Sequence, residues 1–216
     1  MILEKMSDFF DKRKVGYDEH MLNNVEGCKN GYEVLASLVS DSSEAILDLG
    51  CGTGLELASI FDRLPAVHVT GIDMCEGMLR LLREKYHGKD ITLINASYLG
   101  YDFGKEMYDT AISFETMHHM THSEKLSVYS AVCDALKAGG TYIEGDYMVR
   151  TQAEEDFFFA ESARLRSEQR IPDGEFYHYD TPCTVDNQIM LLKKAGFSDV
   201  EEIWCEGNTV ILTSRK

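Results

Sequence analysis

The apolar positions follow two different periods between about residue 30 and residue 149. Short apolar runs predict strands, and between them apolar residues recur every three or four positions, as in helices that bury one face. The predicted strands are Ala45–Leu49, Val67–Ile72, Ile91–Asn95, Tyr108–Phe114 and Thr141–Met148. Strands that alternate with helices are typical of a mostly parallel, doubly wound α/β sheet with helices on both faces.

The pattern changes after Met148 to a polar, aromatic-rich stretch, 150–182, which we interpret as an insertion. Thr184 then caps a last helix, and two further apolar runs follow, Val200–Cys205 and Thr209–Ser214, separated by three turn residues. These runs predict a terminal hairpin. Since a hairpin cannot continue a parallel crossover pattern, at least one of its strands must be antiparallel to the rest.

Composition and charge exclude several classes of protein. The chain has 216 residues, 44% of them hydrophobic and 27% charged, which suits one globular domain rather than a disordered segment or a repeat array. Its formal charge of −16, from 21 basic and 37 acidic residues, would repel a phosphate backbone, so nucleic acid is not the expected partner.

The same sequence lacks the features of exported and membrane proteins. The first residues do not combine a basic region with an apolar core, and no run of roughly 18 apolar residues occurs. The six cysteines form no C-x-x-C pair and do not cluster, which favours free thiols in a reducing compartment. We therefore expect a cytoplasmic protein with no membrane partner.

The strongest chemical signal is the segment 46–54, Ile-Leu-Asp-Leu-Gly-Cys-Gly-Thr-Gly, in which an apolar strand opens into a glycine-rich turn. Glycines let the backbone approach a ligand closely, and the helix that follows presents unpaired N–H groups. Asp48 precedes the turn, where its carboxylate could organise these amides or attract a cationic ligand group. Asp73 follows the second strand, about twenty residues later, where an acid can accept hydrogen bonds from both ribose hydroxyls. The segment therefore predicts a nucleoside site.

The glycine spacing and two further motifs narrow the class of site. Gly50, Gly52 and Gly54 form G-x-G-x-G, whereas the dinucleotide fingerprint G-x-G-x-x-G would need glycine at Leu55. D-L-G-C-G-T-G, the acid after the second strand and A-L-K-A-G-G before the fifth resemble the class I S-adenosylmethionine-dependent methyltransferase family. The resemblance covers roughly residues 30 to 149, more loosely the end, and implies seven strands with the last antiparallel.

This resemblance also implies which residues hold S-adenosylmethionine. The methionine part should lie against the three glycines, the ribose on Asp73 and the adenine beside Met74. Where the family often has an acid for the adenine amino group, this chain has Asn95-Ala96-Ser97, so the contact there is neutral. The expected cofactor residues are Tyr17, Asp48, Gly50, Gly52, Gly54, Asp73, Met74, Ala96, Ser97, Phe114 and Glu115.

Three histidines, His118, His119 and His122, follow the fourth strand and permit two interpretations. Glu115 and His118 make a single E-x-x-H step where carboxylate metal bundles need two, so we expect no metal. His118 or His119, at the strand-end edge, could instead act as a general base, while packing or capping is the alternative role.

These observations together predict an enzyme of one domain, 1–216, with an N-terminal helical cap over 1–30 and a substrate lid over 150–182. It should transfer a methyl group from S-adenosylmethionine to a small molecule that the sequence does not identify. Two other functions stay open: a nicotinamide-dependent oxidoreductase, and a protein that binds adenosyl ligands without turnover. For 150–182 the alternative is a dimerisation arm, and hence a homodimer, because exposed aromatics also form interfaces.

Overall fold

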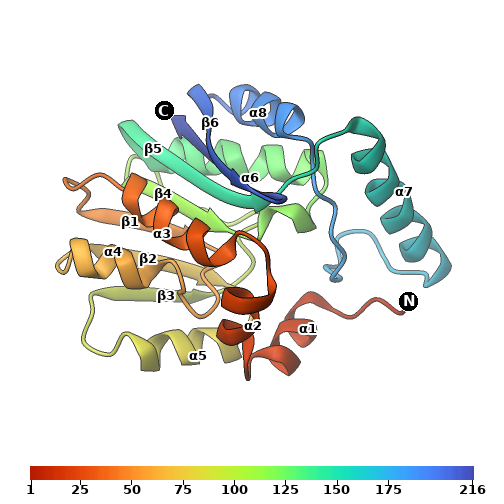
Figure 1. Cartoon of the computed structure of the whole chain (residues 1–216), viewed down its shortest axis with the longest axis horizontal. Helices are drawn as coiled ribbons and strands as arrows, with labels where there is room; N and C mark the ends of the chain where they lie inside the picture. Colours follow the sequence, from red (N-terminus) through yellow and green to blue (C-terminus); the bar gives the residue numbers. More distant parts are fainter.

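One seven-stranded sheet forms the centre of the molecule, whose 216 residues are all described by a computed structural model (Figure 1). The strand order is β3-β2-β1-β4-β5-β7-β6. All neighbours are parallel except β7, which runs antiparallel to both β5 and β6. The strands are β1 Ala45–Leu49, β2 His68–Asp73, β3 Ile91–Asn95, β4 Tyr108–Phe114, β5 Leu136–Tyr147, β6 Ser198–Glu206 and β7 Thr209–Arg215.

Helices cover both faces of this sheet, because successive side chains of a buried strand point to opposite faces. On β1, Ile46 packs into one apolar cluster, with α3, α4 and α5, and Leu47 packs into the other, with α6 and α8. A short 3₁₀ turn, η1, follows β4. The helices are α1 Met6–Arg13, α2 Tyr17–Asn24, α3 Cys28–Leu38, α4 Leu57–Arg63, α5 Glu76–Lys85, α6 His122–Ala135, α7 Gln152–Glu168 and α8 Val185–Lys194, with η1 at Met117–His119.

The N-terminal residues and the segment 150–182 are joined to each other. Lys5 forms an antiparallel bridge with Tyr177, the Met6 N–H donates to the Phe176 carbonyl (3.0 Å), and the His178 N–H donates to the Glu4 carbonyl (2.9 Å). We call this contact between residues 3–6 and 176–178 the seam. It brings together the N-terminal segment and the insertion, two parts of the sequence that lie outside the alternating pattern.

The predicted fold is confirmed, including the antiparallel hairpin at the C-terminal edge. Three strands, Ala45–Leu49, Ile91–Asn95 and Tyr108–Phe114, have the predicted bounds. The fifth strand is longer than predicted, because Leu136 already pairs with Tyr108 before a bulge interrupts the register. No helix is both long and apolar enough to span a membrane.

Candidate functional site

The turn between β1 and α4 is braced from β2, by Asp73. Asp73 Oδ2 accepts a hydrogen bond from the Gly52 N–H (3.0 Å), and its Oδ1 accepts one from the Cys75 N–H (2.7 Å). Burial raises the pKa of Asp73, although both amides favour its ionised form. One carboxylate therefore orders two loops at the carboxyl edge of the sheet, and its remaining lone pairs are available to a ligand.

The three glycines of this turn have different structural reasons. All have positive φ, at +68° for Gly50, +47° for Gly52 and +71° for Gly54, where side chains are strained. A Cβ on Gly50 would overlap the Thr116 side chain, and one on Gly54 would lie 3.0 Å from the Tyr86 ring. A Cβ on Gly52 would have only the Gly50 carbonyl within 4 Å. Gly52 is thus the glycine that faces open space.

Asp48 does not organise the turn, contrary to one of the two roles suggested from the sequence. It is fully buried, and neither carboxylate oxygen accepts a hydrogen bond from an amide, because Asp73 has taken that place. Its neighbour is the buried Glu56. Burial raises the pKa of both acids, that of Glu56 to about 7, and the charge of Glu56 raises the pKa of Asp48 further. The attraction of Asp48 for a cationic ligand stays a prediction.

A cavity of about 50 Å³ lies beside this turn. It joins Gly50, Asp73, Met74 and Ser97, which are four of the predicted cofactor residues, and two segments cover it, α1 through Phe10 and the insertion through Phe176. The Tyr98 hydroxyl shares a hydrogen bond of 2.9 Å with Thr116 Oγ1. The remaining lining residues are Met6, Tyr98, Thr116 and His119.

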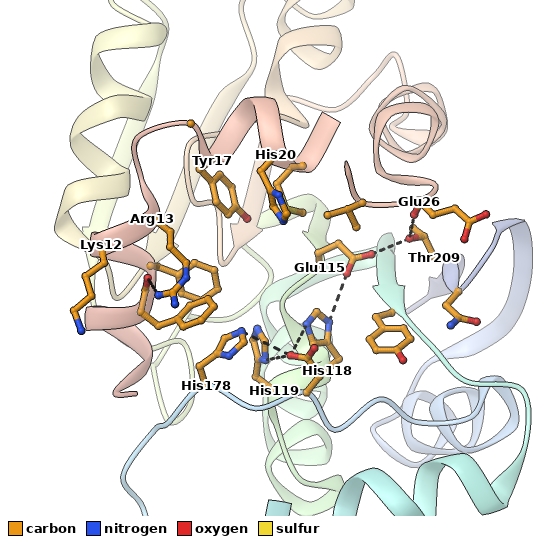
Figure 2. A pocket seen from close by; sticks show the side chains of 18 of the residues that line it. Lys12, Arg13, Tyr17, His20, Glu26, Glu115, His118, His119, His178 and Thr209 are labelled. Carbon is orange, nitrogen blue, oxygen red and sulfur yellow. Dashed lines mark hydrogen bonds and ion pairs between the residues drawn. The ribbon is translucent and has the colours of Figure 1, made fainter. Parts of the chain in front are cut away.

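A much larger cavity, about 820 Å³, adjoins the first, and Phe10 and His119 line both (Figure 2). We call it the chamber. Figure 2 shows His118, His119 and His178 in a row along one wall, with Tyr17 and His20 opposite them. Glu115, Glu26 and Thr209 lie at one side and Lys12 and Arg13 at the other. The chamber therefore carries ionisable groups and aromatic rings, as a small-molecule site does.

The histidine wall is held by carboxylates. His118 Nδ1 lies 2.7 Å from the buried Asp146 Oδ1, at the end of β5. Asp180 Oδ1, from the insertion, lies 3.4 Å from His119 Nδ1, 3.7 Å from His118 Nε2 and 3.8 Å from His178 Nε2. His178 is fixed by stacking on Phe9, with ring centroids 3.5 Å apart.

Charge states differ along this wall. Although burial opposes charge, Asp146 raises the pKa of His118 to about 9. Burial lowers the pKa of His119, and it lowers that of His178 to about 4. Although burial opposes ionisation, the imidazoles hold the pKa of Asp180 below its usual range. His119 and His178 are thus neutral at pH 7, with lone pairs available.

Some predicted residues lie outside both cavities. Phe114 packs against Tyr32, with ring centroids 4.2 Å apart, so its side chain belongs to the core beneath α3. Ala96 packs on the opposite core cluster and contributes its N–H to the Asp73 carbonyl (3.1 Å). Glu115, the next residue after Phe114, reaches the chamber because its φ is +51°. Asp146 and Asp180 were missed, although Asp146 ends a strand just as Asp73 does.

Comparison with known proteins supports a specific family. Residues 46–140 match the family model described as a methyltransferase domain. The chain is 23% identical over 158 residues to phosphoethanolamine N-methyltransferase of Plasmodium falciparum, covering 73% of this chain and 59% of that protein. It is 21% identical over 216 aligned positions to carboxy-S-adenosyl-L-methionine synthase of Nautilia profundicola, covering 94% of this chain and 91% of that protein.

A solved structure of similar fold carries a ligand. Human N-acetylserotonin methyltransferase in complex with SAM superposes with a TM-score of 0.69 at 15% identity, covering 99% of this chain and 59% of that protein. At that identity the likeness is one of fold. The chain spans 59% of the length of two of these three proteins, so the remainder of their length has no counterpart in it.

Proposed function

We propose that the chain is a class I S-adenosylmethionine-dependent methyltransferase and that it transfers the methyl group of this cofactor to a small molecule held in the chamber. The observation that carries the proposal is the junction of the two cavities. The adenosyl cavity beside Asp73 and the 820 Å³ chamber share Phe10 and His119, so two ligands can meet there. Such a meeting of ligands is what methyl transfer requires.

In this proposal the ribose binds Asp73, and the adenine lies beside Met74 and Ser97. The methionine part passes Gly50 and Gly52 toward the chamber, where Tyr17 closes over it and Glu115 lies within reach of its ammonium group. Support comes from the open space above Gly52 and from the position of Tyr17 on the chamber wall. Phe114, Ala96 and Gly54 act indirectly, through the packing and hydrogen bonds of their neighbours.

We also propose that 1–30 and 150–182 act together as the cover of one domain. Within the insertion, Phe176, His178 and Asp180 reach the cavities, whereas no residue of α7 lines either of them. Phe157 of α7 is 62% exposed. The aromatic run of α7 thus supports a surface role better than a substrate wall, and residues 176–180 form the part of the insertion next to the acceptor.

Methyl transfer here is an in-line displacement. The acceptor atom forms a bond to the methyl carbon while the carbon–sulfur bond breaks, and the sulfonium takes that electron pair and leaves as a neutral thioether. The protein aligns the two ligands and excludes water, and alignment alone can contribute roughly 7 to 11 kcal/mol to lowering the barrier. The acceptor proton must also leave, and we assign its removal to His119, which lines the chamber and whose lowered pKa keeps it neutral, whereas His118, with a pKa raised to about 9 beside Asp146, already holds a proton.

Calorimetry and a thermal shift test the proposal. A ligand at 100 times its dissociation constant adds about 2.7 kcal/mol to the folded state, which for a chain of this length is a rise of roughly 5 to 11 °C. We expect this rise with S-adenosylhomocysteine and none with NAD. Methyl-labelled cofactor incubated with a small-molecule extract should then label a product. Binding of NAD alone would support the oxidoreductase, and adenosyl binding without labelled product would support a non-catalytic protein.

A second function, that of a synthase, is favoured by a relative that aligns with this chain over nearly its whole length. The carboxy-S-adenosyl-L-methionine synthase of Campylobacter hominis is 23% identical to the chain over 99% of this chain and 96% of that protein. That name describes a product made from the cofactor itself. Mass spectrometry separates the two reactions. Methyl transfer yields S-adenosylhomocysteine, which is lighter than the cofactor, whereas a synthase yields a carboxylated product, which is heavier than the cofactor.

A further inference from the structure

Three side chains of the chamber wall, His118, His119 and Asp180, bring their ligand atoms together, and a fourth, His178, lies beside Asp180. Asp180 Oδ1 lies 3.4, 3.7 and 3.8 Å from nitrogens of His119, His118 and His178. The ligand atoms of His118, His119 and Asp180 all lie within 4.8 Å of one another. In a tetrahedral site with metal–nitrogen bonds of about 2.0–2.1 Å, ligand atoms lie about 3.3 Å apart, so these distances are those of a metal site.

Two ligand atoms of this group have no hydrogen-bond partner outside it. His119 Nδ1 and Asp180 Oδ1 are both buried and neither makes a hydrogen bond of normal geometry. Buried polar atoms without partners are rare, and each needs an explanation. Both atoms belong to the same group of side chains, and a cation between them would satisfy both.

A carboxylate on the core side of His118 fixes the orientation of its ring. Its Nδ1 lies 2.7 Å from Asp146 Oδ1, and Asp146 is fully buried at the end of β5. A carboxylate that accepts from Nδ1–H turns Nε2 toward the chamber, which is the arrangement of metal-bound histidines, and a metal ion would displace the proton that Nε2 otherwise holds at pH 7. His178 is held in a similar way by its stacking on Phe9.

We propose that His118 Nε2, His119 Nδ1, His178 Nε2 and Asp180 Oδ1 form a site for a divalent transition-metal ion. Three imidazoles and one carboxylate favour Zn²⁺ or a neighbour in the first row over Mg²⁺, which prefers oxygen ligands. The sequence argument against a metal rested on the single E-x-x-H step of Glu115 and His118. The third histidine of that region, His122, lies outside the site, since it contacts Glu155 of α7 at 2.8 Å. The ligands that replace it, His178 and Asp180, come from a segment some sixty residues away in the sequence.

The ion would lie where the two cavities meet, because His119 lines both. An ion held by these four side chains would take an oxygen or nitrogen atom of the acceptor by expanding to five ligands on the side of the chamber. His118 and His119 then act on the acceptor through the ion rather than as a free base. This last role rests on the proposed function, whereas binding of the ion does not.

Titration of tag-free, chelator-treated protein with Co²⁺, followed by visible absorption and by competition with Zn²⁺, tests the site. We expect one ion per chain. His178→Phe keeps the ring that stacks on Phe9, and Asp180→Asn keeps the shape of the carboxylate. Each should weaken binding by more than the roughly 10-fold that loss of even an outer-shell partner costs. His122→Phe is the matched control and should bind as the wild type does, because His122 belongs to a different cluster, with Glu155 and Cys183.

The proposal is overturned if the wild type binds no Co²⁺, if His178→Phe and Asp180→Asn bind as tightly as the wild type, or if His122→Phe alone loses the ion. Affinity for S-adenosylhomocysteine, measured on the same samples, reports folding and separates the two proposals. Absence of Co²⁺ binding with this affinity retained contradicts the metal site alone. Co²⁺ binding without adenosyl binding contradicts the methyl-transfer proposal alone.

Discussion

The two cavities are built in opposite ways. The small cavity depends on consecutive residues at the ends of adjacent strands, so that Gly50 and Asp73 meet because β1 and β2 are neighbours in the sheet. The chamber combines α1 and α2, η1, the end of β5, residues 178–180 and the turn between β6 and β7, which come from five separate parts of the sequence. The floor of the small cavity is thus determined by local structure, and the chamber by how distant segments pack. We call these two cavities the adenosyl side and the acceptor side of the proposed site. Substitutions on the first side should affect ligand affinity, and those on the second should also affect stability.

The largest expected effect is on the adenosyl side. Gly52→Val should remove measurable S-adenosylhomocysteine binding, because a branched side chain would enter the open space above the turn. Calorimetry measures this, and Gly52→Ala gives the part due to backbone strain, about 1 to 2 kcal/mol of stability. If a folded Gly52→Val protein bound S-adenosylhomocysteine with the affinity of the wild type, the cofactor would lie away from this turn, and the small cavity would not be the adenosyl side.

In α7, which belongs to the insertion but lines neither cavity, Glu155→Ala should lower the free energy of unfolding by about 3 kcal/mol, or roughly 6 to 12 °C. Glu155 is buried and accepts hydrogen bonds from the Thr184 N–H and the Asn187 side chain, which would lose their acceptor. Adenosyl affinity should stay within a few-fold of the wild type. Glu154→Ala, which removes the exposed capping partner of Thr151, is the control and should cost under about 1 kcal/mol. An equal loss of adenosyl affinity in Glu155→Ala would show that the insertion and the adenosyl side are not separable.

Asp73→Asn should weaken adenosyl binding by about 1.5 to 3 kcal/mol, since charge-assisted hydrogen bonds become neutral ones. A titration measures the affinity, and thermal unfolding reports whether the hydrogen bonds from the Gly52 and Cys75 amides to residue 73 are retained. Asp102→Asn provides the comparison, because Asp102 also accepts from an amide two residues ahead, that of Gly104 at 2.9 Å, away from both cavities. Equal affinities of Asp73→Asn and wild type would mean that Asp73 braces the turn without touching the ribose.

The smallest effect concerns pH. Burial raises the pKa of Glu56 from 4.5 to about 7, so the folded state favours its protonated form. Its contribution to stability is complete below pH 4.5 and is lost as the pH rises through about 7. Glu56→Gln, which keeps the shape of the side chain and cannot ionise, should therefore unfold a few degrees higher than the wild type at pH 8, with little difference at pH 4.5. A constant difference between the two proteins from pH 4.5 to 8 would contradict this account.

The sequence predicted what depends on local patterns. The period of apolar residues gave the sheet and its hairpin, and the rule that ligands bind at strand ends led to Asp73 and to the histidines after β4. The same rule, applied to β5, would have found Asp146. Asp180 and the metal-like arrangement could not have been found, because 150–182 has no regular period and its position depends on the seam with residues 3–6. The packing of Phe114 in the core could not be predicted for a similar reason, as the direction of its side chain depends on Tyr32 from a distant helix.

The seam has a kinetic consequence. Residues 3–6 and 176–178 are hydrogen-bonded to each other, and α1 and the insertion both cover the two cavities (Figure 1). Displacing either segment exposes both ligands, so exchange of cofactor and exchange of acceptor depend on one conformational step. When that step is slower than the chemistry, the first turnover is faster than all later ones. A rapid burst of methylated product, equal to the concentration of enzyme, is then the expected form of the reaction, and weakening the seam should raise the steady rate that follows it.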